Sequence, residues 1–244
     1  MTERRRRYKV VRRGRPRREP GEAKRDATRR HLLARALELF QQRGVEATTM
    51  RDIARAAGMS LGAAYYYFPS KEALVFAYYE ANQDEMEALA ASATGSLRER
   101  LGVLFHGKLA SIRPQRRMLA AIVSRLVDPS DPLGAFSQAS RAVRQRAIRL
   151  LEDALADSGL PEQTIALAAH GLWLAQLAIL LVYVNDTSPG ERRSHGLVDD
   201  LLDLIVPLAP MFGTPIGASI VTRVMAALGR AGIELVPASP RSEV

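Results

Sequence analysis

Apolar residues recur at helical spacing along almost the whole chain, and no segment alternates apolar and polar residues as a half-buried strand does. Leu33, Leu37 and Phe40, for example, share one helix face, and Gly44 follows as a left-handed stop. The pattern therefore predicts an all-α fold, with helices at about residues 26–43, 50–57, 61–67, 71–93, 96–112, 114–127, 133–157, 161–184, 194–212 and 215–230.

The positive charge is concentrated at the N-terminal end. The 244 residues include 35 Lys and Arg against 26 Asp and Glu, and residues 1–30 hold 14 of the basic residues but only four acidic ones. Gly and Pro interrupt these residues and apolar periodicity is lacking, so we expect residues 1–25 to form a disordered basic arm. Basic arms of this kind bind polyanions.

Two short helices joined by a tight turn are predicted at residues 49–68. Thr49 can cap the first helix, with Asp52 three residues later as in a capping box, and Gly58 ends it. Ser60 can cap the second helix, which Pro69 terminates. This spacing is typical of a helix-turn-helix motif.

The residue identities in this segment indicate a protein family more specifically than the spacing of its helices does. T-T-M-R-D-I-A-R-A-A-G-M-S-L-G-A-A-Y-Y-Y-F-P-S-K-E-A-L resembles the signature of the tetracycline-repressor (TetR) family of bacterial regulators. The matching positions are Thr49, Ile53, Ala54, Ala57, Gly58, Ser60, Gly62, Tyr65, Phe68, Lys71, Glu72 and Leu74. The resemblance covers residues 26–86 and implies a three-helix DNA-binding domain there. It also implies a helical ligand-binding and dimerisation domain over residues 87–232, followed by a flexible tail at 233–244.

By resemblance, Tyr65 and Tyr67 contact the DNA backbone, Tyr66 faces the groove beside Ala63, and Lys71 binds a phosphate. Thr49 and Ser60 can either cap their helices or bond a phosphate. Leu61 stands where many family members carry a polar residue, so we expect apolar contacts to thymine methyls and few polar contacts to bases. The expected DNA-binding residues are therefore Thr49, Arg51, Ser60, Leu61, Gly62, Ala63, Tyr65, Tyr66, Tyr67 and Lys71.

The arm offers a second DNA element. Arg13, Arg15 and Arg17 lie in a segment that resembles the Arg-Gly-Arg-Pro core of AT-hooks, which place arginines in the minor groove. The alternative is a nonspecific tether that raises affinity through counterion release.

Residues 165–184 carry no Asp, Glu, Lys or Arg and are long enough to cross a membrane. His170 and Gln176 lie in the middle of this segment and no basic cluster flanks it, so we favour a buried helix over a membrane span. By resemblance, helices 161–184 and 194–212 form the interface of a homodimer, whose two recognition helices would read a palindromic double-stranded DNA operator.

The resemblance also implies a pocket for a small-molecule effector among the middle helices. Each candidate could instead be ordinary core, but aliphatic residues dominate and favour a hydrophobic or amphipathic ligand. The candidates are Phe105, His106, Leu109, Met118, Ile122, Phe136, Trp173, Gln176 and Leu177.

Enzymatic motifs are missing from the sequence. It contains no cysteine, no phosphate-binding Gly-rich loop and no G-x-S-x-G, and its four histidines lack metal-ligand spacing. We therefore expect no catalysis, no cofactor and no metal. The N-terminal residues are too charged for a secretory signal, which favours a cytoplasmic location. By resemblance, we expect a nucleoid-associated repressor. An architectural DNA-binding protein and a membrane-anchored sensor are the alternatives.

Overall fold

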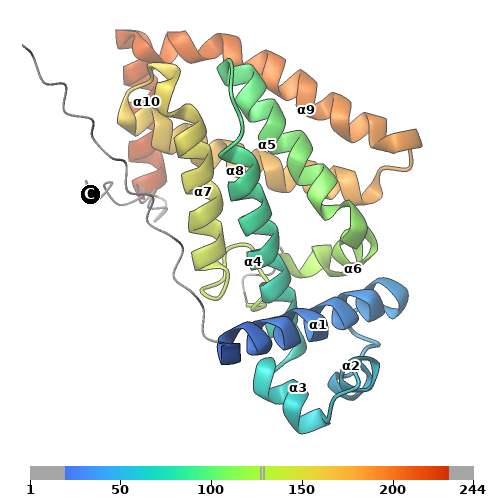
Figure 1. The fold of residues 1–244 in the computed structure, drawn as a ribbon. Helices are drawn as coiled ribbons and strands as arrows, with labels where there is room; N and C mark the ends of the chain where they lie inside the picture. Colours follow the sequence, from blue (N-terminus) through green and yellow to red (C-terminus); the bar gives the residue numbers. More distant parts are fainter. Residues whose placement is uncertain (1–19, 127, 129, 231–244) are drawn as a thin grey trace, which may run out of the picture.

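The computed structural model describes residues 20–126, 128 and 130–230, and this part of the chain contains α- and 3-10 helices but no strand (Figure 1). The all-α prediction is confirmed. The α-helices are α1 Pro20–Arg43, α2 Met50–Ala56, α3 Leu61–Tyr67, α4 Lys71–Ala90, α5 Leu97–Ile112, α6 Arg116–Leu126, α7 Arg141–Leu155, α8 Glu162–Asn185, α9 Arg192–Ile205 and α10 Pro215–Arg230. Four 3-10 segments connect them, η1 Arg113–Gln115, η2 Ala156–Ser158, η3 Pro189–Glu191 and η4 Val206–Gly213.

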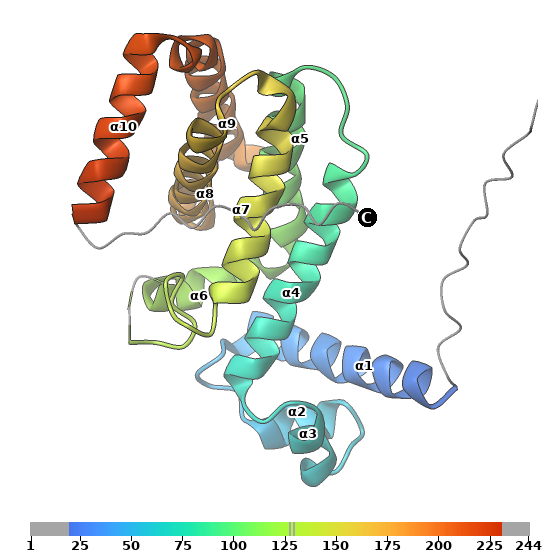
Figure 2. The same ribbon diagram turned by 90° about the vertical axis from the view of Figure 1, so that its left-hand side faces the viewer.

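Helices α1, α2 and α3 form a small unit at one end of the molecule, and α4 runs from it into the larger body (Figures 1 and 2). Ile53 of α2, Ala64 of α3 and Leu74 of α4 are fully buried in its core. Phe68 ends α3 and is also buried. Burial of these apolar side chains fixes the orientation of α3, whose opposite face is left to solvent.

The body is a bundle in which α5 lies between α4 and α9 and α8 packs against α7, α6 and α9. Figure 2 shows α10 at the outer edge of this bundle, where it contacts α8 and η4. The C-terminal helices therefore extend the layer built by α8 and α9.

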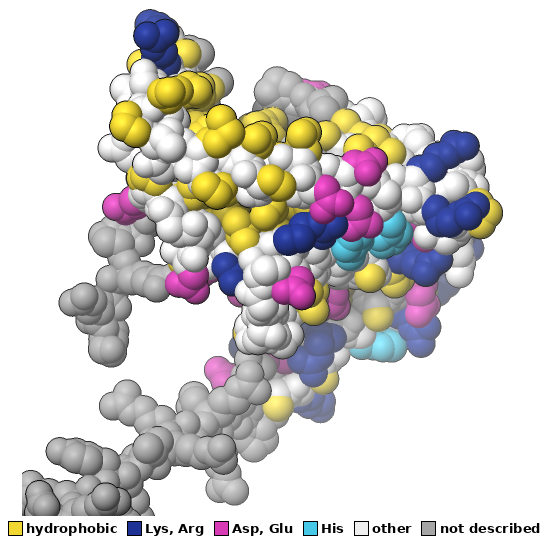
Figure 3. Space-filling view, turned by 90° about the horizontal axis from the view of Figure 1, so that it is seen from above, with side chains coloured by type: hydrophobic (Ala, Val, Ile, Leu, Met, Phe, Trp, Pro, Cys, Tyr) yellow, Lys and Arg dark blue, Asp and Glu magenta, His cyan; other side chains and the backbone are white. Residues whose placement is uncertain are grey.

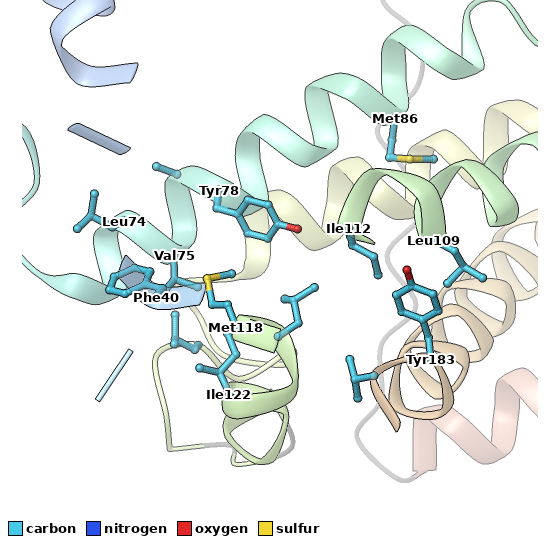
Figure 4. Close-up of a cluster of buried hydrophobic side chains, with 14 of the residues drawn as sticks. Phe40, Leu74, Val75, Tyr78, Met86, Leu109, Ile112, Met118, Ile122 and Tyr183 are labelled. Carbon is cyan, nitrogen blue, oxygen red and sulfur yellow. The ribbon is translucent and has the colours of Figure 1, made fainter. Parts of the chain in front are cut away.

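Helix α6 joins the body to α1. Phe40 of α1, Val75 of α4 and Met118 and Ile122 of α6 are buried together at this junction (Figure 4). Gln41 of α1 adds polar links, because its Oε1 accepts a hydrogen bond of 3.0 Å from the Met118 backbone N–H and its amide donates to the Pro114 carbonyl. Helix α1 is therefore linked to α6 and the preceding η1 segment by apolar packing and by hydrogen bonds.

Three predicted boundaries are wrong. Helix α1 begins at Pro20, so residues 20–25 are helical and do not belong to the arm. Helix α7 begins at Arg141 rather than at residue 133, because Asp131 and Ser137 accept hydrogen bonds from the backbone of the preceding turns. Helix α9 ends at Ile205, since the prolines of η4 cannot donate α-helical hydrogen bonds. The other helices are present with small shifts at their ends.

Candidate DNA-binding surface and interior cavity

The two helices of the helix-turn-helix are capped by the side chains that the sequence suggested. Thr49 Oγ1 accepts a hydrogen bond of 3.1 Å from the Asp52 N–H, and the Asp52 carboxylate accepts one from the Thr49 N–H. Asp52 Oδ2 also accepts a hydrogen bond of 2.6 Å from the Thr49 hydroxyl. This bond and the one from the Thr49 N–H hold the pKa of Asp52 below its ordinary value. Ser60 Oγ accepts a hydrogen bond of 3.1 Å from the Ala63 N–H at the start of α3. Both residues are exposed, so capping leaves each hydroxyl at the surface.

The outer face of α3 carries exposed tyrosines. Tyr66 is 68% exposed and Tyr65 is 47% exposed, and the exposed backbone of Gly62 lies one turn earlier. Leu61, Ala63 and Tyr67 are partly buried. Tyr65, Tyr66 and Gly62 are thus the solvent-exposed residues of α3, and Arg51 of α2 is exposed as well.

Helix α1 supports this surface through residues that the sequence did not single out. Arg25 Nη2 donates a hydrogen bond of 2.9 Å to Tyr66 Oη, and its guanidinium lies 5.9 Å from the Tyr66 ring centroid. Arg29 stacks over Phe68, with its guanidinium 4.7 Å from the ring centroid. Tyr66 also meets the Tyr67 ring edge-on at 5.2 Å. The sequence placed Arg25 in the arm, which is why this contact was missed.

Lys71 forms hydrogen bonds within the DNA-binding unit. Its Nζ donates hydrogen bonds of 2.7 Å to the Val45 carbonyl and 3.3 Å to the Glu46 carbonyl. The side chain therefore bridges the start of α4 and the loop before α2. Arg13, Arg15 and Arg17 lie outside the described residues.

A cavity of about 140 Å³ lies inside the body, between α4, α5, α7 and α8 and under residues 133–140. Five of the expected effector residues line it, namely Phe105, Leu109, Trp173, Gln176 and Leu177. Tyr78, Tyr79, Asn82, Lys108 and Arg144 line it as well. Sequence reasoning missed these polar residues because helical periodicity does not reveal which ones point inward.

The other four expected effector residues do not line this cavity. Met118 and Ile122 belong to the buried junction with α1. Phe136 is 63% exposed and contacts Trp173 edge-on from outside, with ring centroids 5.5 Å apart. His106 points toward α9, where its Nδ1 is 2.8 Å from His195 Nδ1 and its Nε2 is 3.1 Å from Asp199 Oδ1. None of these four residues therefore borders the cavity.

The C-terminal helices present apolar side chains to solvent. The exposed ones include Leu174, Leu181 and Val182 of α8, Leu197 and Leu204 of α9, and Leu208 of η4. Figure 3 looks onto the end formed by α9, η4 and α10, where apolar side chains gather. Helix α8 is long and apolar enough to cross a membrane, and 28% of its most apolar window is buried by the described part of the chain. An apolar helix covered so little by its own chain needs a further partner.

Among residues 20–126, 128 and 130–230, no group of three or more His, Asp or Glu side chains is arranged to hold a metal ion. The His106–His195 pair is instead surrounded by an ion-pair network. Arg98 donates to Asp199 at 2.9 Å and to Asp203 at 2.7 Å. The cluster links α5 to α9.

The chain shares sequence with known bacterial regulators. The HTH-type transcriptional regulator AcrR of Shigella flexneri is 34% identical over 97 residues, which are 38% of this chain and 45% of that protein. The HTH-type transcriptional repressor KstR2 of Rhodococcus jostii is 53% identical over 47 residues, 19% of this chain and 23% of that protein. The chain thus covers less than half of the length of either relative.

The fold and the family models extend the likeness to both halves of the chain. The crystal structure of the TetR transcriptional regulator from Nitrosomonas europaea has a TM-score of 0.58 at 21% identity, and the match covers 73% of this chain and 98% of that one. Residues 32–78 match the model for bacterial regulatory proteins of the tetR family, and residues 100–211 match the model for the tetracyclin repressor-like C-terminal domain. The chain belongs to the tetR family of bacterial regulatory proteins.

Proposed function

We propose that the protein is a sequence-specific DNA-binding transcriptional regulator that represses from a palindromic operator and is released by a small effector. The observation that carries this proposal is the outer face of α3, where Tyr65 and Tyr66 are exposed on a helix whose other face is buried. A short helix held rigidly at a convex end of the molecule can enter the major groove, and its phenols can position it on the backbone.

Homodimerisation through α8 and α9 is part of the proposal. The exposed leucines of these helices would be covered by the same surface of a second copy, which is how a two-fold interface forms. A dimer of this kind presents two α3 helices to half-sites about 34–36 Å apart. We propose that it acts in the cytoplasm on the nucleoid and carries out no catalysis.

The interior cavity supplies the effector site of the proposal. It lies between α4 and α8, so a ligand there contacts both the helix that leads to the DNA-binding unit and the helix of the proposed dimer interface. A ligand that binds better to one relative arrangement of these helices shifts the population toward it and changes the affinity for DNA by the same coupling energy.

The test is recovery of bound fragments from sheared genomic DNA at near-physiological salt, with the full chain and with a variant lacking residues 1–19. A few fragments that share one inverted repeat would support an operator-specific dimer. Uniform recovery that disappears in the truncated variant would contradict it and favour an architectural protein driven by the basic arm. A Tyr65→Ala variant serves as the control that the fragments are bound through α3.

A further inference from the structure

The lining of the interior cavity carries positive charge that no lining carboxylate balances. Its charged residues are Lys108 and Arg144, and the described lining contains neither Asp nor Glu. Arg144 donates to the Ala135 carbonyl at 2.7 Å and to Ser140 Oγ at 3.1 Å, and no described carboxylate forms an ion pair with it. A cavity with this charge favours an anion over a cation.

Two hydroxyl groups at the cavity have no partner. The phenol oxygens of Tyr78 and Tyr79 are buried and have no hydrogen-bond partner among the described residues. Tyr78 is only 8% exposed, and Figure 4 shows it pointing from α4 toward α5 on the side of Ile112. Burial raises the pKa of both phenols, so each remains a hydrogen-bond donor at neutral pH. A buried donor without an acceptor is costly, and a bound ligand with acceptor oxygens would satisfy it.

Lys108 lies at the inner end of a polar chain. Its Nζ donates to Asn82 Oδ1, the Asn82 amide donates to Ser111 Oγ, and Ser111 donates to Glu85 at 2.5 Å. Glu85 is exposed at the far end of this chain, and among the described residues it forms no ion pair with Lys108. Burial lowers the pKa of Lys108 to about 8, which leaves most of the population charged at pH 7. Asn82 thus orients an ammonium group that keeps further N–H donors for a ligand.

Most of the other lining residues are apolar, apart from Gln83, Ser140 and Gln176. Leu109 of α5, Leu133 of the covering segment, and Trp173, Leu177 and Leu180 of α8 line it. These side chains match a hydrocarbon or a flat apolar ring.

We infer that the effector is an amphipathic anion, with a carboxylate bound by Lys108 and Tyr78 and an apolar body packed against Trp173 and Leu177. This inference rests on the proposed function only in calling the ligand the effector. Binding of such an anion is a property of the cavity and can be measured without DNA.

The chain contains its own probe for this measurement, because Trp173 is the only tryptophan in the sequence and lines the cavity. Trp173 fluorescence is titrated at pH 7 with octanoate, 1-octanol and octylammonium, which share one hydrocarbon chain and differ in the charge of the head group. We expect octanoate to bind at least about tenfold more tightly than the other two, because a charge-assisted hydrogen bond to a buried group contributes about 1.5–3 kcal/mol. Equal affinities for octanoate and octanol, or no saturable octanoate binding, would overturn the inference.

Variants locate the anion site. Lys108→Met keeps the aliphatic stem but should abolish the preference for octanoate over octanol, whereas Lys108→Arg should retain it. Tyr78→Phe should weaken octanoate severalfold and leave octanol unchanged. The matched control is Tyr183→Phe, which removes the hydroxyl of a buried tyrosine that does not line the cavity. An unchanged octanoate preference in folded Lys108→Met would place the anion elsewhere and refute the assignment.

A parallel measurement separates this inference from the proposed function. Binding of the recovered operator fragment is measured with and without octanoate. Operator binding without any octanoate binding would refute the inferred anion site and would leave the proposed regulatory function unaffected. If the protein recovers no operator fragment but binds octanoate in a manner that depends on Lys108, the proposed regulatory function is refuted and the anion site is supported.

Discussion

Arg25 Nη2 donates a hydrogen bond of 2.9 Å to Tyr66 Oη, so the first turns of α1 hold the most exposed tyrosine of α3. The two residues are far apart in sequence, and the contact exists because α1 lies between the α2–α3 pair and the rest of the molecule (Figure 1). The recognition surface therefore includes part of α1.

We predict that Arg25→Met and Tyr66→Phe each weaken operator binding about threefold to tenfold, because an exposed hydrogen bond contributes about 0.5–1.5 kcal/mol. The double variant should lose little more than either single variant, since both remove the same bond. Fluorescence anisotropy with labelled operator measures all three. Additive losses would mean that Arg25 binds DNA independently of Tyr66.

Lys71→Met should destabilise the DNA-binding unit rather than weaken a phosphate contact. The ammonium group donates to the Val45 and Glu46 carbonyls, and charge-assisted bonds of this kind contribute about 1.5–3 kcal/mol. Urea denaturation should report a loss of that order, while the slope of log affinity against log salt stays the same. Lys24→Met, which alters an exposed lysine of α1, is the matched control for stability. If the slope of log affinity against log salt becomes shallower by about one in Lys71→Met, Lys71 binds a DNA phosphate.

Leu204→Asp should dissociate the proposed dimer. Leu204 is 65% exposed on α9, and a charge placed in an apolar two-fold interface is desolvated twice. We expect a monomer in analytical ultracentrifugation and at least about a hundredfold loss of operator affinity, because one half-site alone then remains engaged. Ala121→Asp places the same charge on an exposed residue of α6 and should remain dimeric. If the Leu204→Asp protein remains dimeric, this face of α9 is not the dimer interface.

Asp186 should stabilise the fold in a pH-dependent manner. Its carboxylate accepts hydrogen bonds from the N–H and hydroxyl groups of Ser188 and Ser194, which joins the end of α8 to the start of α9. These bonds lower the pKa of Asp186 well below the ordinary value of 3.8. Because the folded-state pKa is the lower one, the stabilisation is complete above the unfolded-state pKa and is lost as the pH falls toward the folded-state value.

Asp186→Asn tests this relationship. The difference in free energy of unfolding between wild type and variant should be largest near pH 7 and shrink below about pH 4. Asp200→Asn, at an exposed residue of α9, is the comparison variant. A difference that does not depend on pH would mean that Asp186 acts through packing and not through its charge.

Local signals in the sequence were sufficient for much of the architecture. Thr49, Ser60 and Gly58 mark helix ends through hydrogen bonds and backbone conformations that involve residues only a few positions away, and the structure has these ends as predicted. The helical spacing of apolar residues is also a local signal, because it predicts a helix without any knowledge of what that helix packs against.

The contacts of individual side chains were decided by the tertiary structure. Helical periodicity shows that Met118, Ile122 and Leu109 are buried, but not that the first two pack on α1 while the third borders a cavity. In the same way, nothing near Lys71 in the sequence indicates that it bonds carbonyls before α2, or that His106 meets His195.

By itself, the sequence determined which segments are helical, where the DNA-binding motif lies and which helix faces are apolar, because these depend on neighbours within one or two turns. The tertiary structure alone decided which polar groups converge on the interior cavity and which arginines support α3. These contacts depend on the angles at which the helices cross. The crossing angles are set by the packing of side chains from distant parts of the chain.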